Sequence, residues 1–376
     1  EMYRYDPSSG EIAHLGDLGA AAGETGREAI PQGKSHTRFA EAGGKLYFAT
    51  HLSYYTMKEG HETIGEPPPG YEPYSGGRFL AYDLAGGEFE DIAHVPGQGI
   101  LTMAMDAARG RLYGRTWPNG IFGACDLASR EMIAAPASGE GEAGGEQTFQ
   151  TVCRAMAVDP RDGSAYWTIA DGRIVRYRCS DNALEVVLGD NLRKDYFGSY
   201  HPNSPFHMSY HWRQAVWHPE EVVIYAVHGN SGYLLRFDPA AERVDVIERL
   251  TSRPSRQSGI FDKFSHGYLG FTLGPDGRTL YYLTGGVIYA NGRPLIERQL
   301  RIGAQGQENV HLVTFDLQTH ACRDHGPVFL DGGRRPAYVQ SIGIGEDGSV
   351  YALATVQQGE EERTDLIRIF MGDAYE

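Results

Sequence analysis

A tyrosine near the centre of a short apolar segment recurs along the chain, and this repeat constrains the fold more than any other feature. Each copy follows a turn-forming pair of residues, as in Gly43-Gly44 or Asp276-Gly277. The repeated residues are Tyr47, Tyr113, Tyr166, Tyr225, Tyr281 and Tyr351, at intervals of 53 (166 − 113) to 70 (351 − 281) residues. A repeat of this length predicts one structural unit used several times, with the tyrosines in its core.

Each unit has the pattern of four short strands of one sheet. The tyrosine strand is followed by a loop and by a strand that ends in an aromatic residue and an aspartate, as in Tyr82-Asp83 and Phe237-Asp238. The 49 glycines and 23 tyrosines favour short strands joined by tight turns. A lone four-stranded sheet cannot bury both of its faces, whereas radial repetition packs each sheet against its neighbours. The sequence therefore predicts an all-β fold, a β-propeller.

Six units carry at least three strands, and their first strands begin near residues 36, 99, 152, 212, 268 and 338. Residues Met2 to Leu15 supply two strands of a further unit. We therefore expect a seven-bladed β-propeller that forms a single domain over residues 1–376, with an N-terminal half blade whose missing strands lie upstream of residue 1. The alternative is a six-bladed ring in which the N-terminal strands close the last blade.

The loops of the repeat are unequal. The separation between the tyrosine and the aspartate of the third strand is 13 residues in the second unit (126 − 113) but 36 residues in the first (83 − 47). Long insertions in a compact fold are usually binding or lid loops. Because such insertions and the connections between blades share one face, we expect one plain face and one elaborated face.

The stretch from Lys34 to His51 places two histidines on the elaborated face. We expect strands at His36–Glu41 and Lys45–Thr50, joined by the turn at Gly43-Gly44. Because the chain reverses once between them, the side chains of His36 and His51 should emerge on the same side of the hairpin.

Similar polar and aromatic residues stand at corresponding strand ends of the other units, around the expected mouth of the central channel. These residues are Arg115, Trp117, Arg154, His211, Arg213, His228, Asn230, His266, Tyr268, Arg335, Tyr338 and Gln340, and the neighbouring loops add Tyr54, Tyr55 and Tyr210. Aromatic rings stack on sugar rings, and arginine binds a carboxylate through two parallel hydrogen bonds. The set therefore suits an anionic oligo- or polysaccharide.

Charge and composition exclude other partners. The chain has 34 basic and 49 acidic residues, a net charge of −15, which argues against nucleic acid. No apolar run of about 18 residues is present, so no membrane partner is expected. We interpret the four cysteines, which lie far apart, as small buried hydrophobes.

Cofactor and location remain open at this stage. Two or more of the histidines could instead bind a divalent cation such as Ca²⁺, Mg²⁺ or Zn²⁺, although no known metal-ligand spacing is present. If a signal peptide preceded residue 1 and was removed, the protein would be periplasmic or secreted. The sequence leaves the oligomeric state open.

The segments Ser35-His-Thr-Arg-Phe39 and Leu46-Tyr-Phe-Ala-Thr-His51, together with the loop-rich face, resemble the seven-bladed propeller carbohydrate enzymes. These are the ulvan-lyase-type polysaccharide lyases and related propellers that cut rhamnose–glucuronate linkages. In those lyases a histidine and a tyrosine work beside an arginine that neutralises the uronate carboxylate. The resemblance implies that His36 and His51 match the histidine positions. Tyr55, Tyr210 and Arg213 match no motif and are assigned from their place on the face.

The reaction that the resemblance implies is β-elimination on a uronate-containing glycan. Removal of the proton α to the carboxylate needs a cation that stabilises the enolate-like charge, and a positioned base. We assign Arg213 or Arg154 to the carboxylate, His36 or Tyr210 as the base, and His51 or Tyr55 as the acid.

Three other functions fit the same face. It could hydrolyse a rhamnosyl–glucuronate bond. It could instead act as the streptogramin-lyase and lactonase propellers do, or bind a glycan or protein without catalysis.

Overall fold

The computed structural model describes twelve segments of the chain. They are residues 1–58, 61–133, 152–194, 210–229, 231–258, 264–265, 270–287, 289–290, 293–294, 307–336, 338–358 and 361–371. In these segments the chain is all-β apart from the short helices α1 (Leu18–Ala21) and α2 (Arg253–Ser258) and the 3-10 helix η3 (Asp331–Gly333). No helix of the described segments is long and apolar enough to cross a membrane.

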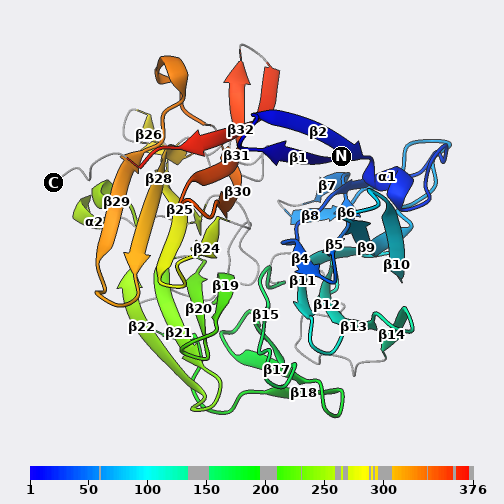
Figure 1. The fold of residues 1–376 in the computed structure, drawn as a ribbon, viewed down its shortest axis with the longest axis horizontal. Helices are drawn as coiled ribbons and strands as arrows, with labels where there is room; N and C mark the ends of the chain where they lie inside the picture. The colour runs from blue at the N-terminus through cyan, green and yellow to red at the C-terminus, as the bar shows by residue number, and fades with distance from the viewer. Residues whose placement is uncertain are drawn as a thin grey trace. The chain divides into compact units, whose positions relative to one another are not determined.

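The described residues divide into two compact units. The first contains those of Glu1–Ile169 and Val175–Val186, and the second contains the others. Successive antiparallel sheets make up each unit, and Figure 1 shows them in chain order.

The first unit begins with a hairpin of β1 (Met2–Asp6) and β2 (Glu11–Gly16). The first blade pairs its strands in the order β10 (Phe89–Pro96), β9 (Gly76–Asp83), β5 (Lys45–Ala49) and β4 (Ala40–Ala42). The second blade contains β11 (Gly99–Asp106), β12 (Arg111–Trp117), β13 (Phe122–Asp126) and β14 (Glu131–Ile133). The third contains β15 (Ala157–Val158), β16 (Ala165–Thr168), β17 (Ile174–Arg178) and β18 (Ala183–Val186). Two small ladders, β3 (Gln32–Lys34) with β6 (His51–Leu52) and β7 (Tyr55–Lys58) with β8 (His61–Ile64), extend the first blade's connections.

The second unit continues the series. The fourth blade contains β19 (Trp212–His218), β20 (Val223–His228), β21 (Tyr233–Asp238) and β22 (Arg243–Arg249). The fifth contains β23 (Phe264–Ser265), β24 (Phe271–Leu273), β25 (Thr279–Val287), β28 (Gln307–Asp316) and β29 (Cys322–Pro327). The sixth contains β30 (Tyr338–Ile344), β31 (Val350–Gln358) and β32 (Glu361–Ile369). A short ladder pairs β26 (Tyr289–Ala290) with β27 (Arg293–Pro294).

The described residues thus form six blade sheets, as the tyrosine repeat predicts, and the fold is an all-β β-propeller. First strands begin at the predicted positions in β11, β19 and β30. The two strands expected at the N-terminus are present and form a separate two-stranded sheet, β1–β2, in which Tyr5 pairs with Ile12. Six blades, and not seven, are seen in the described part of the chain.

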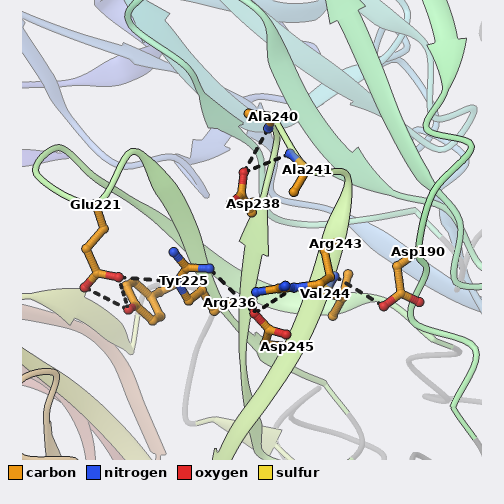
Figure 2. Close-up of polar contacts among 10 residues, drawn as sticks. All are labelled: Asp190, Glu221, Tyr225, Arg236, Asp238, Ala240, Ala241, Arg243, Val244 and Asp245. Atoms are coloured by element: carbon orange, nitrogen blue, oxygen red, sulfur yellow. Dashed lines mark hydrogen bonds and ion pairs between the residues drawn. The ribbon is translucent and has the colours of Figure 1, made fainter.

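The aspartate that ends the third strand of a blade closes the following turn. Oδ1 of Asp238 accepts hydrogen bonds from the backbone N–H groups of Ala240 (2.9 Å) and Ala241 (3.0 Å), as Figure 2 shows. Oδ1 of Asp316 does the same for the second and third residues after it. Such side-chain bonds fix a turn that the backbone alone would leave open. The repeated aromatic–aspartate pair is therefore a structural feature of the repeat.

The cores lie between successive sheets. One buried cluster packs the fourth blade against the fifth and includes Tyr225, Val227, Phe271, Tyr282 and Phe315. Burial of a side chain of this size stabilises the fold by roughly 1.5–3 kcal/mol. Of the six repeated tyrosines, four are buried, while those of the first and sixth blades are half-buried. The prediction that they belong to the core is confirmed for the four.

Charged side chains link the strands of the fourth blade at its partly exposed face (Figure 2). The Tyr225 hydroxyl donates to Glu221 (2.9 and 3.0 Å), and Nε of Arg236 donates to the same carboxylate (3.3 Å). Asp245 lies 3.6 Å from Arg236 and accepts from Arg243 at 2.9 Å. Arg236 of β21 thus joins Glu221, in the turn before β20, to Asp245 of β22, so this network supports the pairing of the three strands.

Candidate functional site

The two histidines of the first blade come from different segments of the chain. His51 begins β6, and its partner across the ladder is Lys34 in β3. His36 lies between β3 and β4, so the predicted strand from His36 begins too early. The side chain of Thr37 accounts for the later start of the strand. Its Oγ1 accepts a hydrogen bond from the backbone N–H of Ala49 (3.1 Å), and in a longer ladder a carbonyl of the paired strand would accept that hydrogen bond instead.

The imidazoles of His36 and His51 touch edge to face. Their ring centroids are 4.9 Å apart with an interplanar angle of 79°, so both side chains do emerge on one side. His51 also packs edge to face on Trp117, with centroids 5.6 Å apart. His51 and Trp117 are each only 1% exposed, whereas His36 is half-buried. Of the two histidines, His36 is therefore the more exposed.

The second blade provides the space that the His51 ring occupies. Gly99 opens β11 and is the partner of Trp117 across the β11–β12 ladder. A Cβ atom at Gly99 would lie 1.7 Å from Nδ1 of His51 and 2.4 Å from its Cε1. Any side chain at this position would therefore collide with the imidazole.

The charges that act on His51 are positive. Burial lowers the pKa of His51 well below its usual 6.5, and the nearby cations Lys34 and Arg154 lower it further. Both cations are half-buried and so keep some access to solvent. His51 is therefore neutral at pH 7 and lies beside two positive side chains. We call Lys34, His36, His51, Trp117 and Arg154 the His36 cluster.

The His36 cluster has the donors for an anion. Ammonium, guanidinium and imidazole groups bind carboxylates and phosphates. Arg38 follows His36 by two residues, and burial lowers its pKa to about 10. In the described part of the chain no three His, Cys, Asp or Glu side chains come together as metal ligands. The donors of the His36 cluster are thus of the kind that suits an anion.

The neutral state of His51 makes stability depend on pH. In the unfolded chain its pKa is about 6.5, whereas in the folded protein it is lower, so below pH 6.5 the unfolded chain binds a proton that the folded protein does not. The free energy of unfolding should therefore fall by about 1 kcal/mol between pH 7.5 and 5.5 from this group. His51→Asn should remove that part of the pH dependence, measured by urea unfolding at both pH values. His14→Asn, at a half-exposed histidine elsewhere in the first unit, serves as the control. An unchanged pH dependence in His51→Asn would contradict the assignment.

A second group of predicted residues lies at one end of the β19–β20 hairpin. The carbonyl of His211 accepts the N–H of Gly229 (3.0 Å), and Nδ1 of His228 lies 2.7 Å from the Ser231 hydroxyl. Both imidazoles are fully buried, and Arg213 is 6% exposed. Tyr210, just before them, is also buried. The structure thus brings these four predicted residues together in the interior, where they present almost no surface to a ligand.

Arg115 also lies in the interior. Its Nη2 donates to the carbonyl of Gly120 at 2.7 Å, and its guanidinium lies over the ring of Trp167, 5.1 Å from the centroid. The side chain has no exposed surface. This arginine is held by the protein itself.

The remaining predicted residues are spread over the chain. Arg335 is exposed, with its guanidinium over the ring of Phe329 (5.4 Å), and Gln340 is exposed on β30. Tyr55 lies in β7 and Tyr338 in β30. Asn230, His266 and Tyr268 lie outside the described residues.

Two residues of the site have no role in the sequence-based prediction: Lys34 and Gly99. Lys34 precedes His36 by two residues, so its basic character was a visible signal. Gly99 opens an apolar strand of the next repeat, and nothing in its local sequence points to His51.

One further histidine–carboxylate pair is structural. Nδ1 of His311 lies 2.8 and 3.0 Å from the two carboxylate oxygens of Asp324, which also accepts the backbone N–H of Arg253 (2.6 Å) and of Gly326 (2.9 Å). Burial raises the pKa of Asp324, but these hydrogen bonds outweigh it and lower the pKa overall. The pair anchors the start of α2 to β29.

Comparison with known proteins supports the fold alone. No model of a known protein family matches the sequence, and the search of curated proteins gives no match. A "putative 6-phosphogluconolactonase" from Bacteroides uniformis is 13% identical, with a TM-score of 0.53 over 98% of this chain and 92% of that one. A second protein so described, from Bacteroides fragilis, is 11% identical, with a TM-score of 0.51 over 99% and 91%. Hydrazine synthase of Kuenenia stuttgartiensis is 10% identical, with a TM-score of 0.54 over 88% and 78%.

Proposed function

We propose that the chain is an enzyme that acts on an anionic sugar, and that the His36 cluster binds the negative group. The reaction that we propose is β-elimination in a uronate-containing polysaccharide. One observation carries the proposal: Lys34 and Arg154 act on a buried, neutral His51 that touches the half-exposed His36. Removal of a proton next to a carboxylate needs cations for the developing negative charge and an imidazole as base.

The residues of the cluster divide the work as follows. Arg154 and Lys34 hold the uronate carboxylate and stabilise the enolate-like charge. His36 takes the α-proton as the C–H bond breaks. His51, buried behind it, keeps the His36 ring in place and adds no positive charge of its own. The bond to the leaving oxygen then breaks as the carbon–carbon double bond forms.

The leaving oxygen takes a proton from an acid, and we propose Tyr55 for this role because it opens β7, the strand that follows β6 and its His51 along the chain. Of the two arginines that the sequence offers for the carboxylate, we choose Arg154. It acts on His51, whereas Arg213 is buried in the second unit. Tyr210, the other candidate base, is buried with Arg213. The proposed partner is an anionic oligo- or polysaccharide.

A second candidate function is hydrolysis of an anionic sugar derivative. Two structures with this fold carry the name "putative 6-phosphogluconolactonase", which refers to a phosphorylated sugar lactone. The cations of the His36 cluster would bind a phosphate as well as a carboxylate. Hydrolysis of a rhamnosyl–glucuronate bond is the corresponding reaction on a polymer. A propeller that only binds a glycan would use the same charges.

The product distinguishes these functions. The purified chain is incubated with a panel of uronate-containing polysaccharides, and with 6-phosphogluconolactone. A lyase yields an unsaturated uronate that absorbs in the ultraviolet, together with new reducing ends. A glycoside hydrolase yields reducing ends without that absorbance, and a lactonase releases acid from the lactone. Binding without any product would leave only the glycan-binding function.

A further inference from the structure

An exposed tyrosine lies close to the His36 cluster along the chain and belongs to no part of the reaction described above. Tyr54 stands between β6 and β7, three residues after His51, and is 44% exposed. Three residues of extended chain span at most about 10 Å. The backbone of Tyr54 therefore lies no farther from His51 than the length of one or two sugar units.

The ring of Tyr54 is held by the hairpin that follows it. In the β7–β8 ladder Tyr55 pairs with Ile64, so Tyr54 and Gly65 are the next residues across from one another. A Cβ atom at Gly65 would lie 2.1 Å from Cδ1 and 2.2 Å from Cε1 of Tyr54. The ring thus lies directly on the glycine backbone. One part of the ring is fixed by the protein, and the exposed remainder is open to solvent.

A fixed, exposed aromatic ring is suited to binding a sugar ring. Stacking on an aromatic ring buries the apolar C–H groups of a pyranose, and a ring already held in place loses little conformational freedom on binding. We propose that Tyr54 forms a neutral sugar-binding subsite next to the His36 cluster, which would select oligosaccharides over single anionic sugars. This inference rests on the proposed function, because it takes the cluster as the neighbouring anion site.

The other interpretation of this contact is structural. An aromatic ring over a cross-strand glycine also stabilises a hairpin. Tyr54→Leu separates the two interpretations, because leucine still covers Gly65 but offers no flat face. Tyr54→Phe keeps the flat face. Tyr71→Leu, at a tyrosine of similar exposure (47%) in the same unit, is the matched control.

Binding is measured by titration calorimetry on the full chain carrying His36→Ala, which prevents turnover during the experiment. The probes are D-glucuronate and a tetrasaccharide of alternating rhamnose and glucuronate. Tyr54→Leu should weaken binding of the tetrasaccharide about fivefold to tenfold and leave glucuronate binding within twofold. Tyr54→Phe and Tyr71→Leu should change neither. The melting temperature of each variant reports any loss of the fold.

Each of the other outcomes contradicts the Tyr54 subsite, the proposed anion site or both. Unchanged tetrasaccharide binding in a folded Tyr54→Leu protein overturns the subsite, and so does equal weakening for both sugars. Lys34→Ala and Arg154→Ala test the proposed function separately, because both should weaken glucuronate binding. If they do not, the anion site is wrong even where Tyr54 matters. If the His36→Ala chain binds neither sugar, both proposals fail.

Discussion

Replacing His36 by alanine should lower turnover of a uronate-containing substrate by about 10²–10⁴-fold while the protein stays folded. His36 is the half-exposed member of the histidine pair and lies outside any strand, so its removal leaves the blade sheets intact. The loss reflects the missing proton acceptor. The measurement is the rate of ultraviolet absorbance from the unsaturated product, together with the melting temperature.

Two further observations separate a catalytic from a structural effect. Added imidazole should restore part of the activity of His36→Ala, because it can diffuse to the place that the side chain has left. His14→Ala, at a half-exposed histidine of the same unit, should keep full activity. Full turnover in the His36→Ala protein would show that the base lies elsewhere.

Replacing Gly99 by alanine should destabilise the protein by about 1–3 kcal/mol, because the new methyl group has to displace the ring of His51. Activity should fall as well, since the imidazole that supports His36 moves. Gly343→Ala is the matched control. Gly343 also lies in a strand, and a Cβ there would meet no atom within 4 Å. Its substitution should change the free energy of unfolding by no more than about 0.5 kcal/mol.

A double-mutant cycle tests whether the methyl group added by Gly99→Ala collides with the imidazole of His51. In a His51→Ala background the imidazole is gone, so the cost of Gly99→Ala should largely disappear. Urea unfolding of the single and double variants gives the coupling energy. If the free-energy costs of the two substitutions simply add, the ring of His51 does not lie against Gly99 as it does in the structure.

Much of the fold could be predicted because its signals are local. The tyrosine strands and the aspartates at Asp238 and Asp316 act through neighbouring residues, so a repeat in the sequence becomes a repeat in the structure. The start of the first strand was misplaced because the Thr37 side chain replaces a backbone partner of Ala49. A hydrophobic pattern carries no sign of such a bond.

The candidate site was predictable in part. The pairing of His36 with His51 followed from one hairpin, because a single chain reversal brings its two ends together. The exposure of the other candidates did not follow. His211, His228 and Arg115 stand at the predicted strand ends, yet their side chains are buried, because burial depends on what packs over a strand end.

The amino-acid sequence by itself determined the repeated four-stranded unit, the turns that close it and the closeness of the two histidines, since strand period and turn chemistry are properties of adjacent residues. Only the tertiary structure decided that His51 is buried and neutral while His36 is partly exposed. The physical reason is that Gly99 and Trp117 come from the second blade and enclose the ring of His51, while Lys34 and Arg154, from separate parts of the first unit, place two positive charges near it.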